Sequence, residues 1–376
     1  MKIAIVHDWL VGYAGGERVL EQIIACYPSA DLFTLLDFVP PEQRGFLGGR
    51  PVTTSFVQRL PLARRHYRSY LGLMPLAVEQ FDLGAYDAVI SSSHAVAKGV
   101  ISGPDQPHIS YVHSPMRYAW DQQHQYLRQS RTDRGLKGAY ARWLLSRLRQ
   151  WDMRTANGVD SFIANSHYIA RRIRKAYRRE AEVIAPPVDT ELFRPGGARG
   201  DAFLVASRQV PYKRIDLIAA AFARMPELRL VISGAGPESA RIRAAAGGAP
   251  NISFLDPCAP AEMATRMQAA RGFVFAGEED FGIVLAEAQA CGTPVIALDR
   301  GGAREIVAGL KAAAPTGVLF GEQSVEGVTA GVRDFIAAEE RISAAACRAA
   351  AERFSIVRFR RDFTAAVERA IREIRD

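Results

Sequence analysis

The sequence predicts an α/β protein with two doubly wound domains, each built on a parallel β-sheet. Short apolar runs alternate with helical segments along most of the chain, and this alternation is typical of βαβ units. The 376 residues exceed what one hydrophobic core usually serves, and a hydrophobic content of 48% is enough for two cores. A stretch rich in Pro and Gly, residues 186–201, separates two strand signals. This stretch is the expected linker between the domains.

The individual strands are expected at short runs rich in apolar and β-branched residues, because such runs suit parallel strands covered on both faces. These runs are 2–6, 87–91, 107–112, 161–165, 181–185, 202–207, 228–233, 251–255, 272–276 and 293–298. Helices are expected between them, for example at 17–27, 216–225 and 326–342. We therefore predict an N-terminal domain at 1–190 and a C-terminal domain at 191–354. A helix at about 355–376 is expected to pack back on the first domain.

Charge and cysteine content narrow the function classes. The 48 Lys and Arg residues outnumber the 40 Asp and Glu residues, and the net charge of +8 favours nucleic acid, a phospholipid surface or a phosphorylated small molecule as partner. The four cysteines share no spacing typical of a metal site, which argues for a reducing compartment and against zinc. No apolar run has the length of a signal peptide or a membrane span. We expect a cytoplasmic protein.

The first candidate for ligand binding is the turn after the first strand, where Gly12, Gly15 and Gly16 lead into a helix. Glycine lets the backbone approach a ligand closely, and the following helix N-terminus offers free N–H groups to a phosphate. An ordinary βα turn would also explain these glycines. The stretch 233–239 comes nearest to G-x-G-x-x-G but lacks the third glycine and an acidic ribose ligand after it, which disfavours a nicotinamide enzyme.

The second candidate is a pair of cations that opens the C-terminal domain. Arg208 comes just after an expected strand, and Lys213 follows five residues later, before a helix. Both cationic groups can therefore converge on one dianionic group at the end of the strand. An exposed loop held by salt bridges is the alternative explanation of this spacing.

The third candidate is a helix start within 278–295. Gly282 marks a tight turn, and residues 283–292 are predicted to form a helix that Gly292 closes, with Pro294 beyond it. The first N–H groups of such a helix have no partner within the helix and carry its positive dipole end. We expect those near Gly282, Ile283 and Val284 to bind a phosphate.

Two carboxylates bracket this helix start, with Glu279 expected in the loop before the helix and Glu287 inside it, one to two turns from its start. Carboxylates accept hydrogen bonds from the hydroxyl groups of sugars and ribose. The pattern therefore predicts a ligand with two polyols joined by a diphosphate. An acidic residue stabilised by the helix dipole would explain Glu279 but not Glu287.

With these segments in view, the chain resembles the family 4 retaining glycosyltransferases of GT-B fold. The E-x7-E pattern of 279–287 and the R-x4-K pair of 208–213 are the most specific features of the resemblance. Supporting motifs are the turn at Gly15 and Gly16, VHSP (112–115), IANS (163–166), PPVDTELF (186–193) and SGAGPE (233–238). The stretch YVHSPMRYAWD (111–121) is similar to bacterial mannosyltransferases of O-antigen and exopolysaccharide assembly.

The resemblance implies two Rossmann-like domains facing across a cleft and a role for each motif residue. Arg208 and Lys213 would hold the donor diphosphate, and Glu279 and Glu287 would bind the hydroxyl groups of the donor sugar and of the ribose. The remaining residues implied to lie near the donor are Gly15, Gly16, His113, Ser114, Gly282, Ile283 and Val284. His113 could instead be a core histidine at a strand end, and the same alternative holds for His94.

The implied reaction transfers a hexose, with GDP-mannose as the expected donor, to a polyprenyl-diphosphate-linked glycan in lipopolysaccharide or exopolysaccharide synthesis. No metal ion or other cofactor is expected, and the chain contains no Asp-x-Asp. The alternatives are a UDP-sugar-dependent transferase and a nucleotide-sugar epimerase of the same fold. A nucleic-acid-binding protein would explain the net charge, but no stacking module or recognition-helix motif is present.

Two basic segments suggest a membrane surface as a further partner. Residues 59–74 are expected to form a helix with an apolar stripe (Leu60, Ala63, Tyr67, Tyr70, Leu71 and Met74) and with Arg64, Arg65 and Arg68 on other faces. Residues 171–179 add six positive charges. Amphipathic basic segments lie on anionic lipid, which here would be the inner face of the cytoplasmic membrane. An ordinary solvated helix face is the alternative for 171–179.

Overall fold

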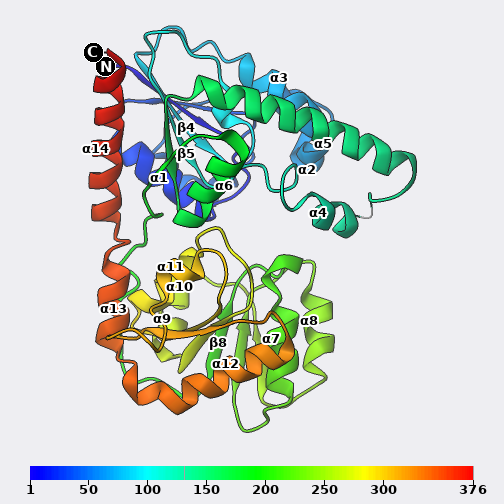
Figure 1. The fold of residues 1–376 in the computed structure, drawn as a ribbon, viewed down its shortest axis with the longest axis vertical. Coiled ribbons are helices and arrows are strands. Elements are labelled where there is room, and N and C mark those ends of the chain that lie inside the picture. Colours follow the sequence, from blue (N-terminus) through cyan, green and yellow to red (C-terminus); the bar gives the residue numbers. More distant parts are fainter. Residues whose placement is uncertain (131, 376) are drawn as a thin grey trace. The chain divides into compact units, whose positions relative to one another are not determined.

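The computed structural model describes residues 1–130 and 132–375 and divides into two compact units (Figure 1). Unit 1 comprises Met1–Ala185 and Phe359–Asp376, and unit 2 comprises Pro186–Arg358. Each unit contains a β-sheet whose paired strands are parallel, with α-helices or 3-10 turns between successive strands. The predicted class, α/β with two Rossmann-like doubly wound domains, is confirmed.

Unit 1 contains a seven-stranded sheet of order β3-β2-β1-β4-β5-β6-β7. Its strands are β1 (Ile3–His7), β2 (Asp31–Thr34), β3 (Val52–Thr54), β4 (Ala88–Ser93), β5 (His108–Val112), β6 (Ser161–Ala164) and β7 (Glu182–Val183). Its helices are α1 (Gly15–Cys26), α2 (Ala63–His66), α3 (Met74–Glu79), α4 (Gln123–Gln129), α5 (Gly135–Thr155), α6 (His167–Tyr177) and most of α14 (Ile356–Arg375).

Strand β1 shows why the strands of unit 1 appear as continuous apolar runs. Ile3 and Ile5 belong to the core cluster shared with α1 and α14, whereas Ala4 and Val6 belong to the cluster shared with α3 and α5. Successive side chains of a strand point to opposite faces, so a strand covered on both faces needs apolar residues at every position. Phe363 of α14 is fully buried in the first of these clusters.

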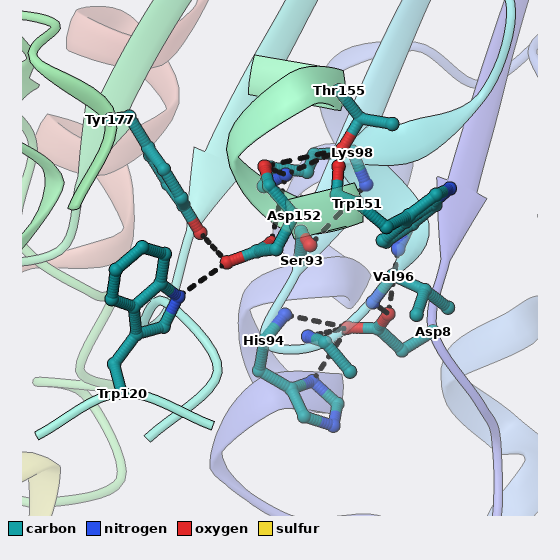
Figure 2. Close-up of polar contacts among 12 residues, drawn as sticks. Asp8, Ser93, His94, Val96, Lys98, Trp120, Trp151, Asp152, Thr155 and Tyr177 are labelled. Carbon is teal, nitrogen blue, oxygen red and sulfur yellow. Dashed lines mark hydrogen bonds and ion pairs between the residues drawn. The ribbon is translucent and has the colours of Figure 1, made fainter. Parts of the chain in front are cut away.

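A buried ion pair ties α5 to the segment after β4 (Figure 2). Lys98 Nζ lies 2.9 Å from Asp152 Oδ1 and also donates to the Asp152 carbonyl and to Thr155 Oγ1. Trp120 Nε1 and the Tyr177 hydroxyl donate to Asp152 Oδ2 at 2.7 and 2.9 Å. All three ammonium protons and both carboxylate oxygens therefore have partners, which buried charges require.

Unit 2 contains a six-stranded sheet of order β10-β9-β8-β11-β12-β13. Its strands are β8 (Phe203–Ala206), β9 (Leu230–Ser233), β10 (Ile252–Leu255), β11 (Gly272–Phe275), β12 (Val295–Leu298) and β13 (Gly317–Phe320). Its helices are α7 (Ile215–Ala223), α8 (Ser239–Ala246), α9 (Pro260–Ala269), α10 (Ile283–Ala290), α11 (Ala303–Ile306), α12 (Val325–Ala338) and α13 (Ala344–Glu352). The strand order reverses between β8 and β11, which makes the carboxyl ends of these two strands the usual ligand position in such a sheet.

Local patterns did not reveal three of the strands or the form of one helical segment. These are β2, β3 and β13, which have three or four residues, and β3 and β13 are edge strands. The expected helix at 59–74 is wrong, because the segment consists of α2 and short 3-10 turns, with Leu62 in the left-handed region at φ 54°. Most of the expected apolar stripe packs onto the core of unit 1 instead of facing a lipid surface.

Candidate functional site

The loops after β8 and β11 bring together the cation and one carboxylate predicted from the sequence in unit 2. Lys213 ends a 3-10 turn (Pro211–Lys213) after β8, and Glu279 lies in the loop between β11 and α10. Lys213 Nζ and Glu279 Oε1 form an ion pair, and their side chains are only 14% and 16% exposed. A Cβ on Gly277 would lie 3.1 Å from Lys213 Cα, so the small residue lets the two loops touch.

The Lys213 ammonium is also placed by aromatic groups. Its Nζ lies 5.1 Å from the ring centroid of Phe275 and 5.5 Å from that of Tyr212. Aromatic faces attract cations at these distances. Together with Glu279 they hold the ammonium at the carboxyl end of the sheet, at the point where the strand order reverses.

Arg208 lies two residues beyond the end of β8, and its side chain is exposed. Within the described residues, its guanidinium has no ion-pair partner, whereas Lys213 is paired with Glu279. The strand end places Arg208 and Lys213 in neighbouring positions of one loop, but the structure does not bring their cationic groups into contact.

Helix α10 begins where the sequence predicts. Gly282 precedes it in the left-handed region at φ 96°, a conformation that glycine adopts without strain. Ile283 and Val284 form the half-exposed first turn, whose N–H groups have no partner within the helix. A Cβ on Gly282 would lie 3.7 Å from Glu279 Cβ, so Glu279 lies beside this helix start.

Glu287, the second carboxylate of the predicted pair, is more buried than Glu279. It lies in the middle of α10 with 5% of its surface exposed, and it interacts with a neighbouring group. Burial raises the pKa of the Cys291 thiol one turn later to about 12, and the negative charge of Glu287 adds to the rise. The structure thus places Glu279 at the helix start and Glu287 inside the domain.

A glycine pair that the sequence reading did not single out supports the Glu279 loop. The Gly302 N–H donates to the Glu279 carbonyl at 2.9 Å. A Cβ would lie 2.2 Å from the Glu279 carbonyl oxygen if added at Gly301, and 2.1 Å from that of Phe281 if added at Gly302. No larger residue fits there without moving the loop. The dipeptide at 301–302 after β12 was the available sequence signal.

The glycines of the 233–239 stretch also have a packing role. A Cβ on Gly234 would lie 2.1 Å from the Ser207 carbonyl oxygen, and one on Gly236 would lie 2.3 Å from that of Gln209. Gln209 Nε2 donates to the Gly234 carbonyl at 2.8 Å. These glycines therefore let the loop after β9 support the loop that carries Arg208.

In unit 1, Gly15 and Gly16 are the first two residues of α1, close to the carboxyl end of β1. Ala14 precedes them and has no side-chain oxygen that could cap the helix. The first N–H groups of α1 therefore lack a side-chain cap, as an anion site at a helix N-terminus requires. The Glu17 carboxylate accepts instead from the Ala14 N–H at 3.0 Å.

His113 follows the last residue of β5 and is half-buried. Its Nε2 lies 2.9 Å from Ser92 Oγ, and burial lowers the pKa of its imidazole to about 3. It is therefore neutral at pH 7. The neighbouring Ser114 is buried and accepts a hydrogen bond from Arg172 at 3.3 Å. Ser114 thus contributes to the packing of α6 against this strand end.

Asp8 organises the turn after β4 (Figure 2), a role that the sequence reading missed. Its buried carboxylate accepts from four consecutive backbone N–H groups, those of residues 94–97. His94 Nδ1 lies 3.0 Å from Asp8 Oδ2, and a third of the His94 side chain is exposed. Burial lowers the pKa of His94 to about 4. The only sequence signal was an Asp directly after a buried strand.

His7, the last residue of β1, completes this cluster. Its Nδ1 lies 3.1 Å from Ser92 Oγ, and its ring centroid lies 6.1 Å from that of His94 and 6.5 Å from that of His113. Burial lowers the pKa of His7 to about 3. Three uncharged imidazoles therefore meet at the carboxyl ends of β1, β4 and β5, the position where the strand order of unit 1 reverses.

The side chains relevant to metal binding are those of the Lys213 and Glu279 loops of unit 2 and of the histidine cluster of unit 1. Within residues 1–130 and 132–375, no group of three or more His, Cys, Asp and Glu side chains is placed to hold a metal ion. The chemistry available from these residues is that of two cations, helix N–H groups, one carboxylate at a helix start and neutral imidazoles.

Comparison with known proteins gives the family context of this geometry. The family model described as Glycosyltransferase Family 4 matches residues 14–192, and the one described as Glycosyl transferases group 1 matches residues 193–354. The D-inositol 3-phosphate glycosyltransferase of Mycobacterium leprae (strain Br4923) is 31% identical over 175 residues, which are 40% of this chain and 41% of that protein. That of Mycobacterium tuberculosis (strain F11) is 30% identical over 40% of this chain and 36% of its own length. The match thus spans about two-fifths of these relatives.

Solved structures extend the likeness of fold to nearly the whole chain. HepE of Anabaena in complex with UDP has a TM-score of 0.73 at 18% identity and covers 98% of this chain and 100% of its own. Sucrose-phosphate synthase from Thermosynechococcus elongatus has a TM-score of 0.72 at 18% identity, with 98% of each chain covered. The two glycosyltransferase family models follow each other over residues 14–354, and each matches the part of the chain that contains one of the two parallel sheets.

Proposed function

We propose that the protein transfers a hexose from a nucleotide-sugar donor to a glycan acceptor with retention of anomeric configuration. The observation that carries the proposal is the pairing of Lys213 with Glu279 beside the start of α10. One ammonium, one carboxylate and a set of free helix N–H groups lie together there, and Arg208 extends from the same loop as Lys213. A sugar diphosphate needs these groups, because its phosphates are anionic and its sugar carries hydroxyls.

The reaction follows from the charge that develops when the bond between sugar and diphosphate breaks. Negative charge grows on the leaving oxygen, so fixed positive groups bind the transition state more strongly than the ground state. We propose that Arg208, Lys213 and the N–H groups of Gly282, Ile283 and Val284 supply this stabilisation without a metal ion. Glu279 would bind the donor sugar and Glu287 the ribose, while Gly15, Gly16, His113 and Ser114 would approach the donor from unit 1.

GDP-mannose is the proposed donor, on the resemblance of residues 111–121 to bacterial mannosyltransferases. A UDP-sugar is the second candidate, because HepE of Anabaena has been solved with UDP and with UDP-glucose. The proposed acceptor is a polyprenyl-diphosphate-linked glycan of lipopolysaccharide or exopolysaccharide synthesis. An inositol phosphate is the second candidate, because the curated relatives are named for it.

A thermal-shift panel of nucleotide sugars tests the donor assignment. A ligand that binds only the folded state raises Tm by mass action, and at about 100 times its Kd it contributes about 2.7 kcal/mol. We expect GDP-mannose to raise Tm more than UDP-glucose, UDP-galactose or UDP-N-acetylglucosamine. Free mannose serves as the control and should leave Tm unchanged. A shift with UDP-sugars and none with GDP-mannose would reject the proposed donor.

Product analysis separates transfer from epimerisation, the remaining alternative for this fold. A transferase releases the nucleoside diphosphate and elongates the acceptor. An epimerase instead returns an altered sugar nucleotide, which chromatography resolves from the donor.

A peripheral position on an anionic membrane is the proposed location. Among the described residues, no helix is both long and apolar enough to cross a bilayer. The exposed face of α5 carries Leu136, Tyr140 and Trp143, which are 91%, 62% and 53% exposed, at helical spacing. Arg147 stacks on Trp143. Aromatic side chains beside basic ones are typical of the interface between lipid and water.

Flotation with anionic liposomes tests the membrane proposal and the surface that carries it. We expect the protein to float at low salt and the variant with Tyr140→Ser and Trp143→Ser to float at least about threefold less, because interfacial binding scales with buried apolar area. The matched control is Arg224→Gln in unit 2, whose exposed guanidinium pairs with Glu326 at 3.0 Å and lies outside both basic segments. Equal flotation of all three proteins would exclude α5 as the membrane surface, and absence of binding would reject the location.

A further inference from the structure

Two buried histidines of unit 1 lie at opposite ends of the sheet and differ in how their nitrogens are satisfied. His108, at the start of β5, has both ring nitrogens in contact, Nδ1 with the Gly158 carbonyl at 3.0 Å and Nε2 with Ser91 Oγ at 2.8 Å. His7, at the end of β1, is 1% exposed, and within the described residues its Nε2 has no hydrogen-bond partner. Since a buried polar group without a partner is costly, this nitrogen requires an explanation.

The position of His7 indicates where a missing partner would come from. A Cβ on Gly16 would lie 3.9 Å from His7 Cε1, the ring carbon bonded to Nε2. Because Cε1 lies between the two ring nitrogens, the side of the ring shared by Nδ1 and Nε2 lies next to the start of α1, which has no side-chain cap. Gly16 has no side chain to cover this edge, and the reversal of strand order between β1 and β4 makes it the usual position of a ligand.

The chemistry of the partner follows from the hydrogen bonds on the other side of the ring. Ser92 Oγ contacts His7 Nδ1 at 3.1 Å and His113 Nε2 at 2.9 Å. Its single proton can go to only one of the two rings, so His7 Nε2 is either a bare acceptor or an N–H donor. A hydroxyl group satisfies both states, because it donates and accepts.

We propose that His7 Nε2 forms a hydrogen bond with a hydroxyl group of the sugar substrate, which makes His7 a substrate-binding residue in addition to those named above. Ser92 fixes the orientation of the His7 ring and links it to His113. The inference rests on the proposed glycosyl transfer. The hydroxyl belongs either to the donor sugar or to the acceptor, and the two sources predict different measurements.

Paired substitutions of His7 separate the role of Nε2 from that of Nδ1. His7→Asn can keep a polar atom near the position of Nδ1, toward Ser92, but leaves nothing at the position of Nε2. His7→Gln can place its amide near the position of Nε2. The matched control is His108→Gln, a buried histidine of the same sheet whose loss affects packing at the other end of the strands.

The measurements are Tm shifts and affinities for the nucleotide sugar that stabilises the wild type most and for its nucleoside diphosphate, together with KM for a polyprenyl-diphosphate-linked monosaccharide. If the hydroxyl belongs to the donor, His7→Asn should weaken nucleotide-sugar binding about three- to tenfold, the usual effect of one lost hydrogen bond, and leave nucleoside diphosphate binding unchanged. If it belongs to the acceptor, only KM for the acceptor should rise by this factor. In both cases His7→Gln should recover most of the loss. His108→Gln should lower Tm but leave nucleotide-sugar affinity and the acceptor KM unchanged.

The inference is overturned if His7→Asn and His7→Gln both bind and react like the wild type, because Nε2 then contacts only water or protein. It is equally overturned if both variants have a lower Tm and bind nucleotide sugar, nucleoside diphosphate and acceptor equally poorly, since that is the result of a structural role. Failure of the proposed function looks different, because no nucleotide sugar would then raise Tm of the wild type.

Discussion

Arg208→Ala should lower turnover of the proposed transfer by about a hundred- to a thousandfold. Removing one fixed group that stabilises developing negative charge typically costs this much in rate. The structure makes Arg208 a suitable case, because its guanidinium is exposed and has no ion-pair partner among the described residues, whereas Lys213 is held by Glu279. Turnover is measured as release of nucleoside diphosphate at saturating donor.

Two further variants show whether this loss arises from the developing charge. Arg208→Lys keeps the positive charge but loses the planar fork that binds two phosphate oxygens, so its turnover should lie between those of the wild type and Arg208→Ala. Arg224→Ala is the matched control, because Arg224 is an exposed arginine of the same unit that pairs with Glu326. Arg208→Ala turnover above a tenth of the wild-type value would remove the proposed role.

The second large effect is expected in stability. Asp152→Ala should destabilise unit 1 by about 3 to 5 kcal/mol, because it leaves the buried ammonium of Lys98 without its counter-charge. The side chains of Lys98 and Asp152 are 2% and 0% exposed. The substitution also removes the acceptor of Trp120 Nε1 and of the Tyr177 hydroxyl (Figure 2). Burial lowers the pKa of Lys98 and Asp152 opposes this change, so the variant lysine should lose its proton more easily.

Tryptophan fluorescence in urea reports the unfolding of unit 1 alone, because the four tryptophans, at positions 9, 120, 143 and 151, all lie in it. Glu180→Ala is the control, since it breaks the exposed pair with Arg174 and should change stability by no more than about 1 kcal/mol. The double variant Lys98→Met with Asp152→Leu should recover most of the loss, because apolar residues of similar size often replace a buried pair without cost. A single Asp152→Ala variant as stable as the wild type would contradict this account.

Much of the architecture could be read from local patterns. Continuous apolar runs are needed wherever helices cover both faces of a strand, and the main strands of both sheets carry them. The edge strands β3 and β13 and the inner strand β2 were not identified, although β6 and β8 to β12, which were identified, have only four residues each, so strand length does not explain the omission. In the segment 59–74, a long helix was predicted where the structure has short helical turns. Its apolar residues at helical spacing pack onto the core from these turns, and Leu62, in the left-handed region, prevents one continuous helix.

The candidate site divides in the same way. Arg208, Lys213, Glu279 and the glycine before α10 occupy short stretches that follow strand ends, and their spacing predicted a diphosphate site. The supports of these stretches, such as the Gly301 and Gly302 turn, come from distant parts of the chain and left no local pattern that identified their role. Glu279 lies in the loop before α10 and Glu287 lies within the helix, as predicted, but the burial of Glu287 was not apparent from its spacing.

Spacing along the chain was sufficient to predict two parallel-sheet domains and the start of α10 after Gly282, because periodic burial and the geometry of a strand followed by a helix act over a few residues. Only the folded chain revealed the contact between Lys213 and Glu279, the backbone hydrogen bonds to the Asp8 carboxylate, and the His7 Nε2 that has no partner among the described residues. Each of these depends on which strands pair and in what register, and parallel pairing joins residues that are far apart in the chain. His7, Ser92 and His113 come from three different strand ends, and no local pattern reports such a meeting.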